Sequence, residues 1–156
     1  MHIHHAKHKA AGFTLIEIMA VVLIMGLLVS IVGYNVFAQV DKARVQTTRA
    51  TISQLESALE FYRMDSSRYP TSEQGIEALV QKPTAPPEPR SYPPEGYLRK
   101  AGSLLDPWGE PFQYESPGQH NTYSYDLWSL GADRAPGGED VDADIGNWDE
   151  ESFADR

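Results

Sequence analysis

An almost uncharged apolar run, residues 13–34, follows a short basic segment and contains a single carboxylate, that of Glu17. A helix needs roughly 20 apolar residues to cross a bilayer, so we expect this run to span a membrane. A carboxylate inside such a run is costly and is retained only where it finds a partner. Glu17 is therefore the first candidate functional residue.

The basic segment predicts the orientation of the chain. Residues 1–12 carry Lys7 and Lys9 but no acid, and they end in three small residues, the last of which is Gly12. The lysines favour a cytoplasmic amino terminus and export of the rest. In a secretory signal peptide the cleavage site follows the apolar segment, whereas here the small residues precede it. Two interpretations remain: cleavage after Gly12, or an uncleaved signal anchor with a histidine-rich cytoplasmic tail.

The stretch KAAGFTLIEIMAVVLIMG, residues 9–26, closely resembles the leader and N-terminal helix of type IV pilin-like proteins. The resemblance implies that a membrane peptidase cuts after Gly12 and that the new amine of Phe13 is methylated. In a packed filament, the carboxylate of Glu17 would then meet the ammonium of Phe13 on a neighbouring subunit. Each charge is costly alone in lipid, but the two compensate each other and would fix the axial register of the subunits.

Composition limits the possible functions. The chain has 22 acidic and 13 basic residues, a formal net charge of −9, and loss of the leader with its two lysines would make this −11. This charge argues against nucleic acid as a partner. No cysteine is present, so no disulfide stabilises the exported part. Outside the leader the histidine is His120, which we expect in a solvent-facing turn. No catalytic triad or zinc spacing is visible, so we predict a protein that is not an enzyme.

Helical spacing continues beyond the apolar run, because apolar positions recur at intervals of three and four up to Tyr62. No proline occurs before Pro70, so we expect one helix from Phe13 to about Met64, with Gly26 and Gly33 as its weakest points. The segments predicted on this basis are a cleaved leader (1–12), a transmembrane and assembly half of the helix (13–38), an exported domain (39–149) and an acidic tail (150–156).

The exported domain is predicted to belong to the α+β class. Thr71 and Gln74 form a capping box that begins a short helix over residues 72–80. A small antiparallel sheet that covers one stripe of the long helix would complete a two-layer, pilin-like fold. The strands expected from alternation and turn residues are Tyr97–Arg99, Pro111–Glu115 and Thr122–Leu130. We expect three tryptophans to pack at turns or over the sheet, and an aromatic ligand groove is the second interpretation; they are Trp108, Trp128 and Trp148.

Three further stretches extend the resemblance over most of the chain. SRYPTSEQGIEALVQKP, DPWGEPFQYESPGQHNTYSYDLWSLGAD and DADIGNW resemble the family of major pseudopilins of type II secretion systems. The resemblance implies a filament subunit that is anchored once in the inner membrane of a Gram-negative bacterium, with its C-terminal domain in the periplasm. Polymerisation into a pseudopilus would drive folded proteins across the outer membrane. The implied partners are other copies of the chain, minor pseudopilins, a prepilin peptidase, an inner-membrane assembly platform with its secretion ATPase, and membrane lipid.

Two alternatives share some of these features. A type IV or competence pilin subunit would have the same amino-terminal pattern. A signal-anchored periplasmic calcium-binding module is an alternative of a different class, and it needs no cleavage after Gly12.

The C-terminal region is rich in acids, with nine between Asp133 and Asp155. Such runs are usually solvated tails, but the glycines and the apolar Ile145 and Trp148 within this one favour a folded loop. Oxygen-rich loops with glycines bind calcium, and an exported protein meets that ion. Calcium is therefore the candidate cofactor.

The resemblance to pseudopilins also implies a set of calcium ligands in this loop. Arg134 replaces the glycine that is usual after Asp133, so we expect it either to strain the turn or to place a cation near the metal. The implied ligands are the side chains of Asp133, Asp144 and Asp142 and the backbone carbonyls of Leu130 and Ala135.

Overall fold

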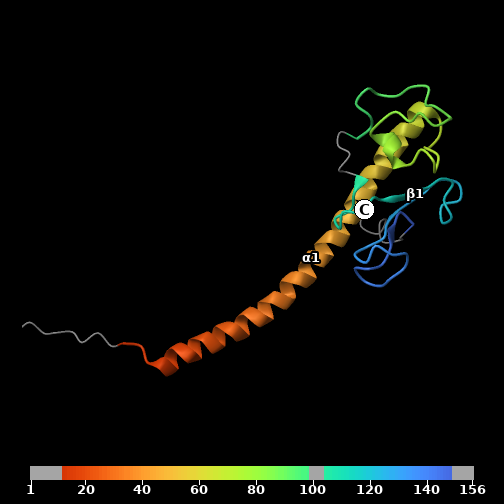
Figure 1. The fold of residues 1–156 in the computed structure, drawn as a ribbon. Helices are drawn as coiled ribbons and strands as arrows, with labels where there is room; N and C mark the ends of the chain where they lie inside the picture. Colours follow the sequence, from red (N-terminus) through yellow and green to blue (C-terminus); the bar gives the residue numbers. More distant parts are fainter. Residues whose placement is uncertain (1–11, 99–103, 149–156) are drawn as a thin grey trace, which may run out of the picture. The chain divides into compact units, whose positions relative to one another are not determined.

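The structure is a computed structural model that describes residues 12–98 and 104–148, without the side chains of residues 31–38. Most of the predicted leader, Arg99 and the tail at 150–156 lie outside the described residues. Helix α1 (Leu15–Ser66) is continuous over 52 residues and passes through Gly26 and Gly33 (Figure 1). The prediction of one long helix is confirmed. The apolar spacing favours a helix along this segment. The segment also contains no proline, so no backbone hydrogen bond of the helix is lost.

Within the described part of the chain, no helix reaches the length and apolar character required for a membrane span.

The chain divides into two compact units, Met1–Gln39 and Val40–Arg156. The second unit holds the hydrophobic core, to which α1 contributes Leu55, Leu59 and Tyr62 at 0 to 1% exposure. Burial of each of the two leucines stabilises the fold by about 1.5–3 kcal/mol. The core residues from outside α1 are Ile76, Ala78, Leu79, Leu98, Leu104, Phe112, Tyr125, Leu127 and Ile145.

The sheet is antiparallel, with strand order β1-β2-β3. Its strands in the described residues are β1 (Gln113–Glu115), β2 (Asp126–Ser129) and β3 (Ile145–Gly146). Leu127 lies opposite Tyr114 of β1, and Ser129 lies opposite Ile145 of β3. The predicted three-stranded antiparallel sheet is therefore confirmed, as is the packing of an α layer on a β layer.

The strand predicted at Tyr97–Arg99 is wrong for its described residues. The backbone N–H groups of Tyr97 and Leu98 instead both donate to the carbonyl of Leu79, at 2.7 and 3.0 Å. The third strand is β3, which consists of two residues inside the acidic region. A pair this short carries no alternation, so the sequence pattern did not reveal it.

Strand β2 is shorter than the predicted segment 122–130. Tyr123 is fully exposed, because the chain turns here and the N–H of Ser124 donates to the carbonyl of Asn121 at 2.9 Å. The predicted alternation holds for Tyr125, Leu127 and Ser129, which are all buried. Asp126, which alternates with these residues along the strand, is also buried.

The short helix begins later than predicted. Thr71 and Gln74 form the expected reciprocal capping bonds, at 3.1 and 3.2 Å. The residues after Thr71 form turns, and a 3₁₀ helix, η1 (Ile76–Leu79), follows. Gly75 has φ of 62°, a left-handed conformation that interrupts right-handed helix between the capping box and η1.

Candidate functional sites at the helix start and in the C-terminal loop

Helix α1 begins with a capping box that the sequence analysis missed. The N–H of Glu17 donates to the Thr14 hydroxyl at 3.3 Å, and the N–H of Thr14 points back to Glu17 Oε2 at 3.5 Å. The pattern Thr-x-x-Glu was the available signal. Glu17 thus has a local role at the start of α1. Its exposed carboxylate lies in the first turn, where negative charge also suits the helix dipole.

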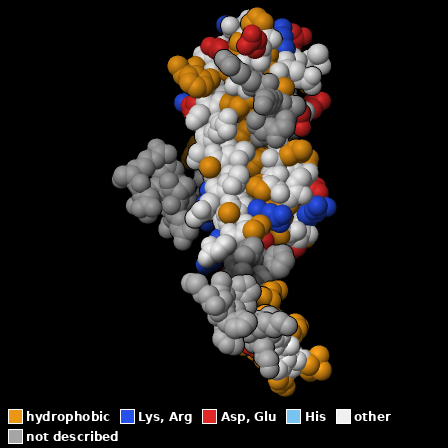
Figure 2. Space-filling view, turned by 90° about the vertical axis from the view of Figure 1, so that its left-hand side faces the viewer, with side chains coloured by type: hydrophobic (Ala, Val, Ile, Leu, Met, Phe, Trp, Pro, Cys, Tyr) orange, Lys and Arg blue, Asp and Glu red, His pale blue; other side chains and the backbone are white. Residues whose placement is uncertain are grey.

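The first unit presents apolar side chains around the helix. Phe13 and Leu15 are 79% and 80% exposed, and the large apolar side chains from Ile16 to Val29 are also exposed. Figure 2 shows hydrophobic side chains gathered at the lower end of the view, over the amino-terminal part of α1. A helix that is apolar on all sides is stable in water only when other groups cover it.

The C-terminal loop between β2 and β3 is folded. The N–H of Ala132 donates to the carbonyl of Val141 at 3.0 Å, which joins the two limbs of the loop. Gly131 has φ of 70°, and a Cβ added there would lie 2.8 Å from the carbonyl oxygen of Ala143. The two limbs therefore approach each other as closely as a glycine allows. Residues 131–148 of the acidic region therefore form a folded loop and not a solvated tail.

Asp144 is the predicted ligand that is best placed for a cation. Its Oδ2 accepts the N–H of Gly137 at 2.9 Å, while its Oδ1 is buried and has no hydrogen-bond partner among the described residues. A buried carboxylate oxygen without a partner is costly, and a bound cation would remove that cost. Asp144 lines one pocket together with Leu130 and Pro136.

The other predicted ligands are less closely gathered. Oδ1 of Asp133 accepts the N–H of Ala135 at 3.0 Å in an exposed turn, and Asp142 lies in the opposite limb of the loop. No group of three or more acidic, histidine or cysteine side chains is arranged for a metal in the part of the chain that the structure describes. Among the predicted ligands, Asp144 thus has the carboxylate oxygen that is buried without a hydrogen-bond partner among the described residues, and oxygen is the ligand atom that calcium prefers.

Arg134 adopts a left-handed backbone conformation, with φ of 60°. Its guanidinium contacts the turn before β1: it donates to the carbonyl of Trp108 at 3.1 Å and lies 3.3 Å from the Glu110 carboxylate. The strained turn was anticipated. The contacts of the side chain tie this limb of the loop to residues 106–110.

Asp126 organises the turn before β2, a role that sequence reasoning missed. Its side chain is 2% exposed and accepts the N–H groups of Gln119, His120 and Asn121 at 2.7 to 2.9 Å. Burial raises the pKa of this carboxyl group, but the hydrogen bonds from His120, Asn121 and Gln119 outweigh it, so the pKa lies below its ordinary value. The signal was a turn-forming Gly-Gln-His-Asn segment just ahead of an isolated strand aspartate.

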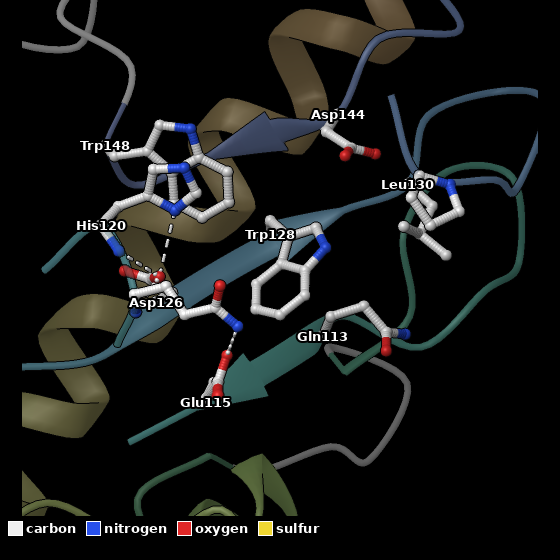
Figure 3. Close-up of a pocket in the computed structure, with 10 residues that line it drawn as sticks. Gln113, Glu115, His120, Asp126, Trp128, Leu130, Asp144 and Trp148 are labelled. Carbon is white, nitrogen blue, oxygen red and sulfur yellow. Dashed lines mark hydrogen bonds and ion pairs between the residues drawn. The ribbon is translucent and has the colours of Figure 1, made fainter. Parts of the chain in front are cut away.

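A pocket of about 290 Å³ lies over the sheet, on the side that carries the side chain of Trp128 (Figure 3). The His120 imidazole stacks on the Trp148 indole with ring centroids 4.0 Å apart, and Trp128 is tilted against Trp148 at 5.8 Å. His120 was predicted to face solvent; it is about half exposed, with one ring face covered. Two of the three tryptophans therefore line a hollow.

These features define a class of protein. The long N-terminal helix packed on a small antiparallel sheet is a pilin-like fold, and residues 7–33 match the prokaryotic N-terminal methylation motif. A crystal structure of the major pseudopilin from the type 2 secretion system of enterohaemorrhagic Escherichia coli is similar, with a TM-score of 0.62 and 46% identity. The match covers 73% of this chain and 94% of that one.

Residues 35–148 match the model of type II secretion system protein G. The core protein G of the type II secretion system of Pseudomonas aeruginosa is 47% identical over 143 residues, which are 92% of this chain and 98% of that protein. The core protein G of Klebsiella michiganensis is 51% identical over 142 residues, or 91% and 95% of the two chains. The chain belongs to the protein G family of type II secretion systems.

Proposed function

We propose that the chain is made as a precursor, cut after Gly12, methylated on Phe13 and polymerised into the pseudopilus of a type II secretion system. The single observation that carries this proposal is the start of α1, where a carboxylate lies one turn from Phe13 among exposed apolar side chains. Membership of the protein G family supports it. The filament would move folded proteins across the outer membrane, and the energy would come from a separate ATPase.

Residues 13–38 would anchor the subunit in the inner membrane before assembly. The exposed apolar side chains from Phe13 to Val29 support this, because lipid or neighbouring helices would cover them. The lysines ahead of Gly12 favour a cytoplasmic amino terminus, which leaves residues 39–149 in the periplasm of a Gram-negative cell. The segment 150–156 would be an acidic tail of that domain.

Cleavage would change the role of Glu17. Removal of the leader creates an ammonium group at Phe13, two residues before α1 begins at Leu15. The carboxylate now bonded to the backbone of Thr14 would gain a charged partner, and in the filament that partner would be the Phe13 amine of an adjacent subunit. The pair would be far less costly among packed helices than either charge alone.

Calcium would hold the C-terminal loop in its folded form. Asp144 and Asp133 would supply carboxylate oxygens and Leu130 a backbone carbonyl, and Asp142 and the carbonyl of Ala135 complete the proposed set. The buried, unpartnered Oδ1 of Asp144 supports this proposal. The ion would supply positive charge that neutralises these oxygens, and its binding energy would add to the stability of the fold.

The proposed partners are copies of the chain, minor pseudopilins, the prepilin peptidase, the assembly platform with its ATPase, and inner-membrane lipid. The role is structural, so the chain needs no catalytic group of its own. The comparisons favour this role over a type IV or competence pilin, because the protein G match covers residues 35–148 in addition to the shared amino terminus.

Mass spectrometry of the chain extracted from membranes tests the proposal. Cleavage after Gly12 predicts a mature protein that begins with N-methylated Phe13. The signal-anchored calcium-binding alternative predicts a chain that still begins at Met1. A Gly12→Val variant serves as the control, because a β-branched residue at the cut site should leave the precursor intact and prevent secretion.

A further inference from the structure

The pocket over the sheet has aromatic walls. It is bounded by Trp128 of β2, by Trp148 after β3 and by His120 in the turn before β2 (Figure 3). Trp148 folds back over its own strand, since a Cβ added at Gly146 would lie 2.6 Å from the Trp148 ring. Strand β3 thus ends in a glycine that lets the indole lie against the backbone. The result is a shelf of two indoles on one face of the sheet.

The described residues that line the pocket include three carboxylates, those of Glu115, Asp126 and Asp144, and no lysine or arginine. Asp126 is fully used by the turn that it organises. Asp144 is assigned to calcium in the proposed function. Glu115 remains, and Gln119 orients it by donating from Nε2 to Oε2 at 3.0 Å.

An indole face beside a carboxylate favours a cation. A guanidinium or ammonium group within about 6 Å of a tryptophan ring is attracted by the ring quadrupole, and a nearby carboxylate adds to this attraction. Gln113 and Gln119 at the rim supply amide groups that hydrogen-bond a planar guanidinium or its peptide backbone. Arginine matches this lining better than lysine, because it stacks on aromatic rings and donates in a fixed geometry.

The cation is more suitably provided by another protein than by a second copy of this chain. Several basic side chains of the described exported domain already contact acids of the same chain: Arg63 pairs with Glu60, Lys82 with Glu88, and Arg134 with Glu110.

We propose that the pocket formed by Trp128, Trp148 and Glu115 binds an arginine side chain of a basic segment on a different protein. The guanidinium lies on the Trp128 indole and faces the Glu115 carboxylate, and the rim amides contact the backbone of the bound segment. This inference goes beyond the filament role and depends on neither cleavage nor polymerisation.

A titration with short capped peptides tests the inference. The full chain, in a mild detergent with excess calcium, is titrated with Gly-Arg-Gly and with the same peptide carrying citrulline, a neutral analogue of arginine. The readout is the indole N–H signal of each tryptophan by NMR. Trp108 lies outside the pocket and is an internal reference. We expect the Trp128 and Trp148 signals to shift with the arginine peptide and the Trp108 signal to stay unchanged.

Two variants and a matched control sharpen the test. Glu115→Gln keeps the shape of the side chain and should weaken arginine binding about two- to five-fold, and Trp128→Phe, read on Trp148, should weaken it by a similar factor. Glu73→Gln removes an exposed carboxylate that lines a different pocket and should leave the affinity unchanged.

Three results would overturn the inference. The first is equal binding of the citrulline peptide. The second is the absence of any shift up to about 10 mM arginine peptide, where a site with a Kd of 1 mM is nearly saturated. The third is a shift of the Trp128 and Trp148 signals with protein concentration alone, because that would place a second copy of the chain in the pocket.

Discussion

Asp144 and Gly137 are joined by two hydrogen bonds that run in opposite directions. The N–H of Asp144 donates to the Gly137 carbonyl at 3.1 Å, and the N–H of Gly137 donates to Asp144 Oδ2 at 2.9 Å. This pair closes the second limb of the acidic loop and fixes the carboxylate of Asp144. Oδ1 is left buried, with no partner among the described residues. The loop is therefore folded around an oxygen that a cation would satisfy.

Calcium removal should destabilise the chain. A ligand present at 100 times its Kd adds about 2.7 kcal/mol to the free energy of unfolding, so EDTA should lower the melting temperature measurably. Asp144→Asn should abolish the difference between calcium and EDTA, whereas Glu139→Gln, an exposed acid of the same loop, should preserve it. Differential scanning fluorimetry makes the measurement. Identical melting curves of the unsubstituted chain with and without EDTA would contradict the proposal that calcium stabilises the fold.

The close approach of the two loop limbs predicts a contrast between two glycines. Gly131 and Gly137 both have positive φ, at 70° and 97°, but a Cβ would meet the backbone of residues 142–143 only at Gly131. Gly137→Ala should cost about 1 kcal/mol through backbone strain. Gly131→Ala should cost about 1–3 kcal/mol more, because the limbs must separate. Urea unfolding of both variants checks this, and equal losses would contradict the described packing.

Asp126 should make stability depend on pH in acid. Its pKa is lower in the folded chain than its ordinary value of 3.8, so its stabilising effect is present above that value and is lost as pH falls through the folded pKa. Asp126→Ala leaves three backbone N–H groups without their acceptor and should cost about 3 kcal/mol at neutral pH. Urea titrations at neutral pH and at pH 2 measure how steeply stability falls in acid. The stability of the Asp126→Ala variant should fall less steeply than that of the Glu73→Gln control. Parallel pH curves would assign the acid sensitivity to other groups.

The charge of Glu17 and its capping role can be separated by substitution. Glu17→Gln keeps a capping acceptor but removes the charge, whereas Thr14→Ala removes the hydroxyl that Glu17 N–H contacts and keeps the charge. If the charge serves assembly, Glu17→Gln and Glu17→Ala should both insert in the membrane and fail to form filaments, and Thr14→Ala should still form them. Secreted enzyme activity and sheared filament protein are the readouts. Normal filaments in Glu17→Gln would leave only the capping role.

The sequence was sufficient for the parts of the fold that rest on long patterns. Helix α1 follows from apolar spacing sustained over dozens of residues, and the buried positions Leu55, Leu59 and Tyr62 follow from the same spacing. The capping box could be predicted from the sequence because its two residues, Thr71 and Gln74, are only three positions apart. Local signals of this kind do not depend on contacts distant in the chain.

Features that depend on distant contacts were not predictable. Strand β3 is only two residues long, and its pairing with Ser129 is fixed by the fold of the whole loop between them. Asp126 resembles an ordinary outward-facing strand residue, and only the returning turn at residues 119–121 encloses it. For the loop, the sequence indicated acids and glycines, but which carboxylate oxygen lacks a partner is decided by three-dimensional packing.

Zero-length cross-linking tests the central claim about assembly most directly. Filaments are grown from a mixture of isotopically heavy and light subunits and treated with a membrane-permeant carbodiimide, and the peptides are identified by mass spectrometry. We predict an amide that joins the Phe13 nitrogen of one isotopic form to the Glu17 carboxylate of the other. Cross-links confined to single chains, or filaments whose subunits still begin at Met1, would contradict it.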